Sequence, residues 1–218
     1  MQKCLMFIAP LLLSQAVMAG AADISSQVKV LWHAQDYTAA HTLLSPLVTK
    51  KNKDAELLAL LGQTEALLHN TEQAEELLEK AVKYDANNAD YQHWYATVSC
   101  NLAASASMFS ALGYAKRCKK AYQTALELAP DNPRSYIALG SFLNQAPGIA
   151  GGDKAEALKL AQKLKQLDPL QGALLALNAS DLTDDAVFTA LLAEDELLSK
   201  RPESYLQRGV AFSRADDH

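Results

Sequence analysis

A glycine-rich segment followed by a lysine is the first pattern in this chain that could do chemistry. It contains Gly148, Gly151 and Gly152, and Asp153 and Lys154 come directly after it. A phosphate-binding loop needs a glycine immediately before the lysine, a serine or threonine after it, and a strand in front. Here aspartate separates glycine from lysine, alanine follows, and the flanks are helical in pattern. We interpret the segment as a tight turn with positive φ and Asp153 as the next helix N-cap, or as an ordered loop that contacts a partner.

Other patterns that could bind a metal or activate a nucleophile do not reach a known motif. The oxygen-rich stretch from Asp85 to Asp90 lacks the length, spacing and distal glutamate of an EF-hand, and Asp and Asn are expected in turns. The five histidines have no metal-ligand spacing, and no Gly-x-Ser-x-Gly elbow occurs. The sequence therefore predicts no catalytic residue, no metal and no cofactor.

Two cysteines, Cys100 and Cys118, form a disulfide candidate if the chain reaches an oxidising compartment. In the usual register of a helical hairpin Cys118 faces Ala96, and Cys100 lies about 6 Å further along the axis. The two Cα atoms would then lie near or beyond the limit of about 7 Å for a disulfide. A disulfide and two buried small residues both remain open. His93 lies about 10 Å from Cys100 on the same helix, too far to activate it.

The elements that must position these residues are helical hairpins. The clearest unit covers residues 55–88 and has small residues, Gly62, Ala74 and Ala81, at its eighth, twentieth and twenty-seventh positions. Small residues at these positions let the two helices of a 34-residue repeat approach closely. The same period predicts hairpins over 23–54, 55–88, 89–132, 133–170 and 171–203, and a capping helix over 204–215.

Two of these hairpins are longer than the repeat period. We place the extra residues in the turns between the two helices of each hairpin, around 101–110 in the third unit and 147–152 in the fourth, because insertions in repeat proteins usually lie in loops. The fifth unit is degenerate, and Thr183 is the expected N-cap of its second helix.

The pattern resembles the tetratricopeptide-repeat (TPR) family over residues 23–218. A narrower resemblance, from Ala103 to Pro169, is to secreted bacterial repeat proteins with an Ala-Pro-Gly-Ile-x-Gly-Gly-x-x-Lys-Ala segment. Here that segment is Ala146 to Ala155, with one residue fewer before the lysine. The resemblance implies a single all-α domain, a right-handed superhelical solenoid of antiparallel hairpins with about five repeats plus a capping helix. It implies no particular activity.

In such solenoids the first helix of each hairpin lines a concave groove. Its outward positions are the predicted binding residues, and they are polar with scattered apolar groups. A groove that binds nothing would look the same, and both interpretations remain open. The predicted groove residues are Trp32, Gln63, His93, Thr97, Asn101, Arg134, Ser141 and Asn144, and the predicted contact loop contains Gly148, Gly151 and Gly152.

Residues 1–22 predict a cleaved signal peptide. Lys3 precedes an apolar stretch from Cys4 to Val17, and small residues follow it. The stretch is shorter than the roughly 20 residues of a membrane span, although an uncleaved anchor helix is the alternative. We expect a periplasmic or secreted protein without a membrane span after cleavage. The net charge of −5 argues against nucleic acid and anionic membranes as partners.

The sequence thus predicts a non-catalytic scaffold of the cell envelope that binds a protein or peptide. Binding would use the concave groove or the extended third hairpin. One alternative is a small-ligand or enzymatic site in the groove, which predicts a closed pocket around His93, Asp90 and Arg134. The other is a structural protein that forms a homo-oligomer through its end hairpins, which predicts a large apolar face at either end.

Overall fold

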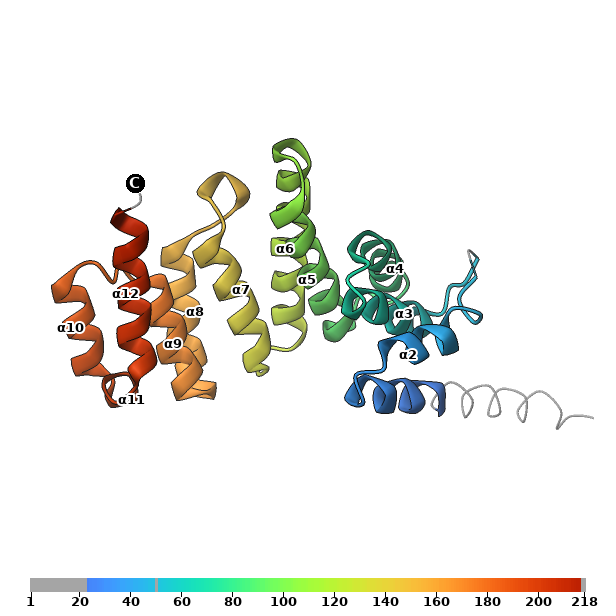
Figure 1. Ribbon diagram of the computed structural model, residues 1–218, viewed down its shortest axis with the longest axis horizontal. Helices are drawn as coiled ribbons and strands as arrows, with labels where there is room; N and C mark the ends of the chain where they lie inside the picture. Colours follow the sequence, from blue (N-terminus) through green and yellow to red (C-terminus); the bar gives the residue numbers. More distant parts are fainter. Residues whose placement is uncertain (1–22, 50, 217–218) are drawn as a thin grey trace, which may run out of the picture. The chain divides into compact units, whose positions relative to one another are not determined.

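The computed structural model describes residues 23–49 and 51–216, and this part of the chain is an all-α helical repeat (Figure 1). The predicted signal peptide lies outside the described residues. The chain divides into two compact units between Tyr84 and Asp85, and each unit is described by itself. A single domain over 23–218 stays a prediction.

The first unit consists of two helical hairpins. Side chains cap the starts of two of its helices: Asp36 accepts a hydrogen bond from the amide of Ala39, and Asp54 accepts from Glu56 and Leu57. Proline at 46 follows the second helix and cannot continue it. The helices cover 23–33 within the described residues, α2 Tyr37–Leu44, α3 Ala55–Leu67 and α4 Thr71–Tyr84.

The small residues of the clearest repeat bring α3 and α4 together. A Cβ on Gly62 would lie 2.8 Å from Cγ of Leu78, so nothing larger than glycine fits without displacing that buried leucine. Ala74 and Ala81 on α4 are fully buried. The eighth, twentieth and twenty-seventh positions are therefore all buried, and the eighth lies where α3 packs closely on α4.

The second unit continues the hairpins from Asp85 onward. Asparagine or aspartate caps five of its helices through side-chain hydrogen bonds, and proline occupies the first turn of α7 and of α9. Its elements are α5 Ala89–Ser105, α6 Met108–Leu128, α7 Pro133–Gln145, the 3₁₀ turn η1 Gly148–Ala150, α8 Lys154–Leu167, α9 Pro169–Ala179, α10 Asp185–Glu194, α11 Glu196–Ser199 and α12 Pro202–Asp216.

The extra residues of the third hairpin lengthen its helices instead of its turn. α5 reaches Ser105 and α6 begins at Met108, so only Ala106 and Ser107 connect them. The expected position of this insertion, in the turn between the helices, is therefore wrong. The inserted stretch is rich in alanine and contains no proline, so it favours helix. The result is the long antiparallel pair in Figure 1.

The last hairpin departs from the expected start of its second helix. Asp184, not Thr183, caps α10, because its carboxylate accepts from the amides of Ala186 and Val187. The hydroxyl of Thr183 donates to Asp181 instead. A local apolar core built on Leu177 and other side chains joins α9 through α12; its buried members are Ala173, Leu177, Leu182, Phe188 and Leu198.

Candidate functional site

The predicted groove residues of the first unit are largely enclosed. Gln63 is only 6% exposed, and Trp32 is half-buried, with its indole Nε1 donating to Oγ1 of Thr64 at 3.1 Å. The expected exposure of Gln63 is therefore wrong. The reason is that α3 contacts both α2 and α4, and every residue from Leu58 to Glu65 is buried.

A buried carboxylate in this unit escaped the sequence interpretation. Glu65 on α3 is fully buried. Its Oε2 accepts from Nδ2 of Asn70 at 2.7 Å, and its Oε1 lies 3.2 Å from Nε2 of His41. A buried carboxylate needs such partners. The contacts connect α2, α3 and the turn before α4, and they give Glu65 a structural role.

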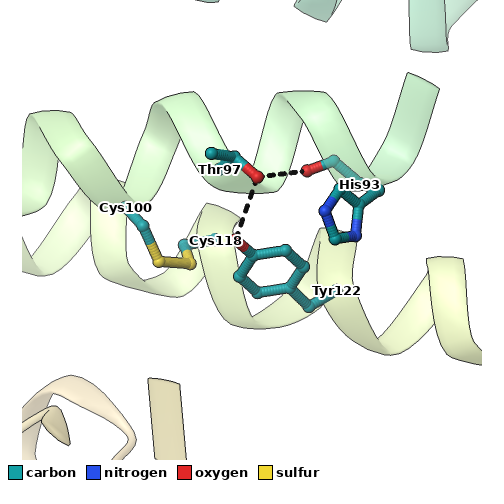
Figure 2. Close-up of a disulfide and its surroundings, with 5 residues drawn as sticks. All are labelled: His93, Thr97, Cys100, Cys118 and Tyr122. Carbon is teal, nitrogen blue, oxygen red and sulfur yellow. Dashed lines mark hydrogen bonds between the residues drawn. A yellow bond between two sulfur atoms is a disulfide. The ribbon is translucent and has the colours of Figure 1, made fainter. Parts of the chain in front are cut away.

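His93 in the second unit is also buried, 8% exposed, and packs against the ring of Tyr122 with centroids 5.3 Å apart (Figure 2). Burial, reinforced by the nearby Arg134 guanidinium, lowers the pKa of His93 from its usual 6.5 to about 4, although Asp90 acts in the opposite direction. The imidazole is therefore neutral at physiological pH. Its exposure on a groove, which the repeat positions predicted, is not observed.

Thr97 connects His93 to the facing helix. Its hydroxyl donates to the backbone oxygen of His93 at 2.9 Å and shares a 3.0 Å hydrogen bond with the hydroxyl of Tyr122 (Figure 2). Burial raises the pKa of Tyr122, against a smaller opposing effect of the hydrogen bond. These contacts occupy the polar atoms of Thr97 inside the hairpin.

Cys100 and Cys118 form a disulfide between α5 and α6 (Figure 2). Their Cα atoms are 5.2 Å apart, shorter than the separation of about 7 Å that the standard repeat register predicts. The register estimate is therefore too long, and of the two open alternatives the structure shows the disulfide. The disulfide, the hydrogen bond and the tilted contact between the His93 and Tyr122 rings together close the interior of this hairpin.

The remaining predicted residues of α5 and the start of α7 lie at the surface. Asn101 is exposed. Arg134 pairs with Asp90, Nη1 to Oδ1 at 3.3 Å, and its guanidinium lies 5.8 Å from the ring centroid of Trp94. The side chains of Arg134 and Asp90 are 49% and 65% exposed, while His93 is buried. The enzymatic alternative requires the three residues to line one closed pocket, and they do not.

Ser141 and Asn144 differ from these residues, because they line an open cleft of about 880 Å³. One wall is polar and comes from α7, from Asn178 at the end of α9 and from the turn that follows it. The second wall comes from α12 and is mostly apolar: Leu206 and Val210 line it together with Gln207, and they are 67% and 50% exposed. The sequence interpretation missed this second wall, since it treated α12 only as a cap.

The cleft carries one charge of each sign, Lys154 and Asp181. Hydrogen bonds from the hydroxyl and the amide of Thr183, at 2.6 and 3.0 Å, hold the pKa of Asp181 below its usual value, and Lys154 adds to the effect. The carboxylate is thus an ionised group fixed by its own turn. Amides, hydroxyls, one ammonium and an apolar wall equip the cleft to bind a ligand by hydrogen bonding and apolar contact.

The glycine-rich loop forms a tight turn, as expected. Gly151 has φ of +99°, and a Cβ on Gly152 would lie 1.7 Å from the backbone oxygen of Ala146. Asp153 caps α8 through the amide of Glu156. Lys119 of α6 pins the loop: its Nζ donates to the oxygen of Gly151 at 3.1 Å. Between loop and α6 lies a groove of about 230 Å³.

A basic cluster on α6 was also missed. Lys116, Arg117, Lys119 and Lys120 follow one another within a single short stretch, and the three lysines line the groove beside the glycine loop. The signal was present in the sequence, but the net charge of the whole chain concealed it.

Among the described residues, no three His, Cys, Asp or Glu side chains are placed so that they could hold a metal ion. None of the helices in residues 23–49 and 51–216 has the length and apolar character needed to cross a membrane.

Comparison with known proteins gives one family and one fold. Residues 25–146 match the family model described as regulator of microtubule dynamics protein 1-3. No curated protein sequence matches the chain.

Solved structures place the fold among TPR proteins. A thermophilic TPR protein of Thermus thermophilus superposes with a TM-score of 0.59 at 17% identity, over 88% of this chain and 98% of that one. The protein MamA of Desulfovibrio magneticus RS-1 does so with a TM-score of 0.62 at 17% identity, over 84% and 97%. A variant of the Thermobaculum terrenum O-GlcNAc transferase gives 0.57 at 25% identity, over 70% of this chain but 27% of the transferase.

Proposed function

This chain belongs to the regulator of microtubule dynamics protein 1-3 family, and on that premise we propose that it is a non-catalytic scaffold that binds a protein or peptide segment. The family description names an action on a protein polymer, which a helical-repeat surface would perform by binding. A fold alone does not define a function, so the proposal rests on the cleft between α7, α9 and α12.

The cleft carries the proposal because its two walls differ in polarity. The amides of Asn144 and Asn178 line one side, and the exposed side chains of Leu206 and Val210 line the other. Its volume of about 880 Å³ falls within the range of about 300–1,000 Å³ typical of ligand sites. A peptide with one apolar face would bury that face against α12 and hydrogen-bond to the amides of the opposite wall.

The chemistry of the same residues favours binding over catalysis. The named lining of the cleft contains one carboxylate and one ammonium and lacks histidine and cysteine. Asp181 accepts hydrogen bonds from its own turn, so it is not poised as a general base. These residues would hold a ligand in place without activating it.

We further propose that the scaffold acts in the periplasm or outside the cell. The first 22 residues have the pattern of a signal peptide, and a disulfide such as Cys100–Cys118 persists in oxidising compartments. The mass of the native protein, purified from a periplasmic or culture fraction, would show whether the first 22 residues have been removed. A chain recovered only from the cytoplasm with Met1 and Lys3 still present rules export out.

A second candidate function, self-association, is favoured by α12. This helix exposes four apolar side chains: Tyr205, Leu206, Val210 and Phe212. A second copy of the chain would cover them. Sedimentation equilibrium tests this candidate: Leu206→Asp should shift a dimer toward monomer, and a chain already monomeric at high micromolar concentration removes it.

Affinity capture from an envelope extract tests the cleft directly. The bait is the mature chain beside two variants, Val210→Asp in the cleft and Val30→Asp as the matched control. Val30 is 66% exposed on the helix over 23–33 and Val210 is 50% exposed, so the control makes the same change on a valine that is at least as accessible. Partners lost with Val210→Asp and retained with Val30→Asp support the proposal. Identical partner sets from all three baits contradict it.

A further inference from the structure

One face of α6 is exposed over several turns. Phe109, Lys116 and Lys120 are spaced seven and four residues apart, so they lie on one side of the helix. Phe109 is 94% exposed, and both lysines are exposed. Gly113, between them on the same side, contributes no side chain. The part of this face that carries Lys116 and Lys120, with the glycine loop beside it, is called the α6 groove below.

The second wall of the α6 groove is the loop around η1. It places Ile149, 80% exposed, opposite the lysines. Contacts within the protein hold this loop in place. Lys119 donates to the oxygen of Gly151 and pairs with Glu156 at 3.4 Å, and the amide of Asp153 donates to Leu143 at 2.8 Å. A rigid apolar wall therefore faces a basic wall.

The positive charges of two lysines on the basic wall are not neutralised inside the protein. Within the described residues neither Lys116 nor Lys120 has an ion-pair partner, whereas Lys119 has Glu156. The chain as a whole is acidic, with a net charge of −5. An isolated positive patch on an acidic molecule attracts an acidic partner and fixes where that partner lands.

We propose that the α6 groove binds an extended acidic segment of a partner protein, in which two carboxylates flank one apolar residue. Lys116 and Lys120 lie about 6 Å apart along the helix, and side chains two apart on an extended strand lie about 7 Å apart on one face. Glutamate or aspartate at those two positions meets both ammonium groups. The residue between them points to the opposite face of the strand, toward Ile149.

A membrane surface fits this arrangement less well than a peptide does. Phe109 lies about 10 Å beyond Lys116 along the helix axis, and Met108 beside it is 81% exposed. A flat anionic bilayer would meet this apolar end of the hairpin first, and it could not enter a groove that lies between a helix and a loop. A single extended chain can reach both walls.

This inference rests on the proposed function only in requiring a protein partner, and it concerns a different surface from the cleft lined by α12. Failure at the α6 groove leaves the Val210→Asp experiment unaffected, and the reverse also holds. The two can therefore be refuted separately.

Fluorescence anisotropy with short labelled peptides tests the proposal. The probe is Gly-Ser-Glu-Leu-Glu-Ser-Gly. One comparator replaces both glutamates with glutamine, and another reorders the centre to Leu-Glu-Glu, which keeps the composition and removes the alternation. The protein is the mature chain, compared with the double variant Lys116→Glu/Lys120→Glu.

The chain offers a closely matched control variant. Lys159 and Lys163 on α8 are also exposed and four residues apart, and they do not line the α6 groove. Lys159→Glu/Lys163→Glu therefore makes the same change in charge elsewhere. Thermal denaturation of both double variants checks that they fold, and Lys116→Gln/Lys120→Gln serves if charge reversal proves disruptive.

The proposal expects the probe to bind the parent chain and to bind Lys116→Glu/Lys120→Glu at least about tenfold more weakly, since two ion pairs are lost. The control variant should change the affinity less than about twofold, both comparators should bind more weakly than the probe, and added salt should weaken binding. Ile149→Ser should weaken binding of the probe but not binding of a version with Glu-Ser-Glu at its centre.

Three results would overturn the proposal. One is no binding of the probe at millimolar concentration. Another is equal weakening by the two double variants, which would mean a general effect of net charge. The third is binding of phosphatidylglycerol vesicles that depends on Lys116 and Lys120 while the probe does not compete, which would assign the lysines to a membrane.

Discussion

The α5–α6 hairpin and the cleft beside α7 use equivalent repeat positions in opposite ways. Thr97 on α5 and Ser141 on α7 both occupy the ninth position of their units, and Cys100 and Asn144 both occupy the twelfth. In the first hairpin, Thr97 hydrogen-bonds to Tyr122 and Cys100 forms a disulfide. In the second, both residues line an open cavity.

The difference teaches that a repeat position fixes the direction of a side chain but not its accessibility. α6 supplies a large phenol and a disulfide-bonded sulfur opposite α5, so Thr97 and Cys100 find partners inside the protein. Beside α7, by contrast, Ser141 and Asn144 line an open cleft, and its second wall, α12, carries an exposed leucine and an exposed valine. Polar residues should therefore stabilise the fold in one region and serve binding in the other.

Removing the disulfide should have the largest effect on stability. The Cys100→Ala/Cys118→Ala variant frees a loop of 18 residues, and its free energy of unfolding should fall by about 3 kcal/mol. Urea denaturation of oxidised protein measures this. A reducing agent should cause a similar loss in the parent chain and none in the variant. A loss below about 1 kcal/mol would show that the hairpin interior is closed without the disulfide.

His93 should make stability depend on pH below neutrality. Its pKa in the folded protein is about 4, against about 6.5 when unfolded. The unfolded chain therefore binds the proton first as pH falls, so the folded state loses stability between about pH 6.5 and 4 and keeps it above that window. The full shift corresponds to about 3 kcal/mol, and we expect about 2 kcal/mol because the burial is incomplete.

Denaturation at pH 7 and at pH 4.5 measures this loss. His93→Leu should show a smaller difference between the two pH values than the parent chain. His33→Gln, on an exposed histidine, is the control and should keep the parent difference. If His93→Leu and the parent respond equally, the imidazole is not the group that titrates in this window.

Tyr122→Phe should have a smaller effect, a loss of about 1 kcal/mol, because it removes one hydroxyl of a partly buried hydrogen bond and leaves its neighbour with only the bond to the backbone oxygen of His93. Its partner there is Thr97 at 3.0 Å. The double variant with Thr97→Val should cost less than the two single variants together, since it removes both polar groups. Strict additivity would indicate that the two hydroxyls do not interact in solution.

Part of this outcome could be predicted from the sequence, because it depends on contacts within one hairpin. Small residues such as Gly62 and Ala74 report how closely two neighbouring helices approach, and that spacing repeats along the chain. Turn residues such as Asp153 report a helix start through a local hydrogen bond. Both kinds of signal act over short distances, so the hairpins were recognisable.

The remainder depends on contacts between elements that the repeat pattern does not specify. Gln63 is buried because α3 is enclosed by its neighbours, and the cleft exists because α12 presents apolar side chains toward it. The 5.2 Å separation of the cysteine Cα atoms depends on the register between α5 and α6, which the repeat pattern did not give correctly. The lysines of α6 were visible, but only their position beside a rigid loop shows that they form a groove.

The smallest effect on stability should come from the polar wall of the cleft. Asn144→Ala removes an amide that lines open space, so its free energy of unfolding should change by less than about 0.5 kcal/mol, as for other surface substitutions. The same variant should nevertheless weaken capture of a partner that Val210→Asp also loses. Urea denaturation and affinity capture, run on the same preparation, measure both. A loss comparable to that of Tyr122→Phe, with capture unchanged, would mean that Asn144 belongs to the packed structure. The contrast between the two regions would then fail, because the ninth and twelfth positions would serve stability in both hairpins.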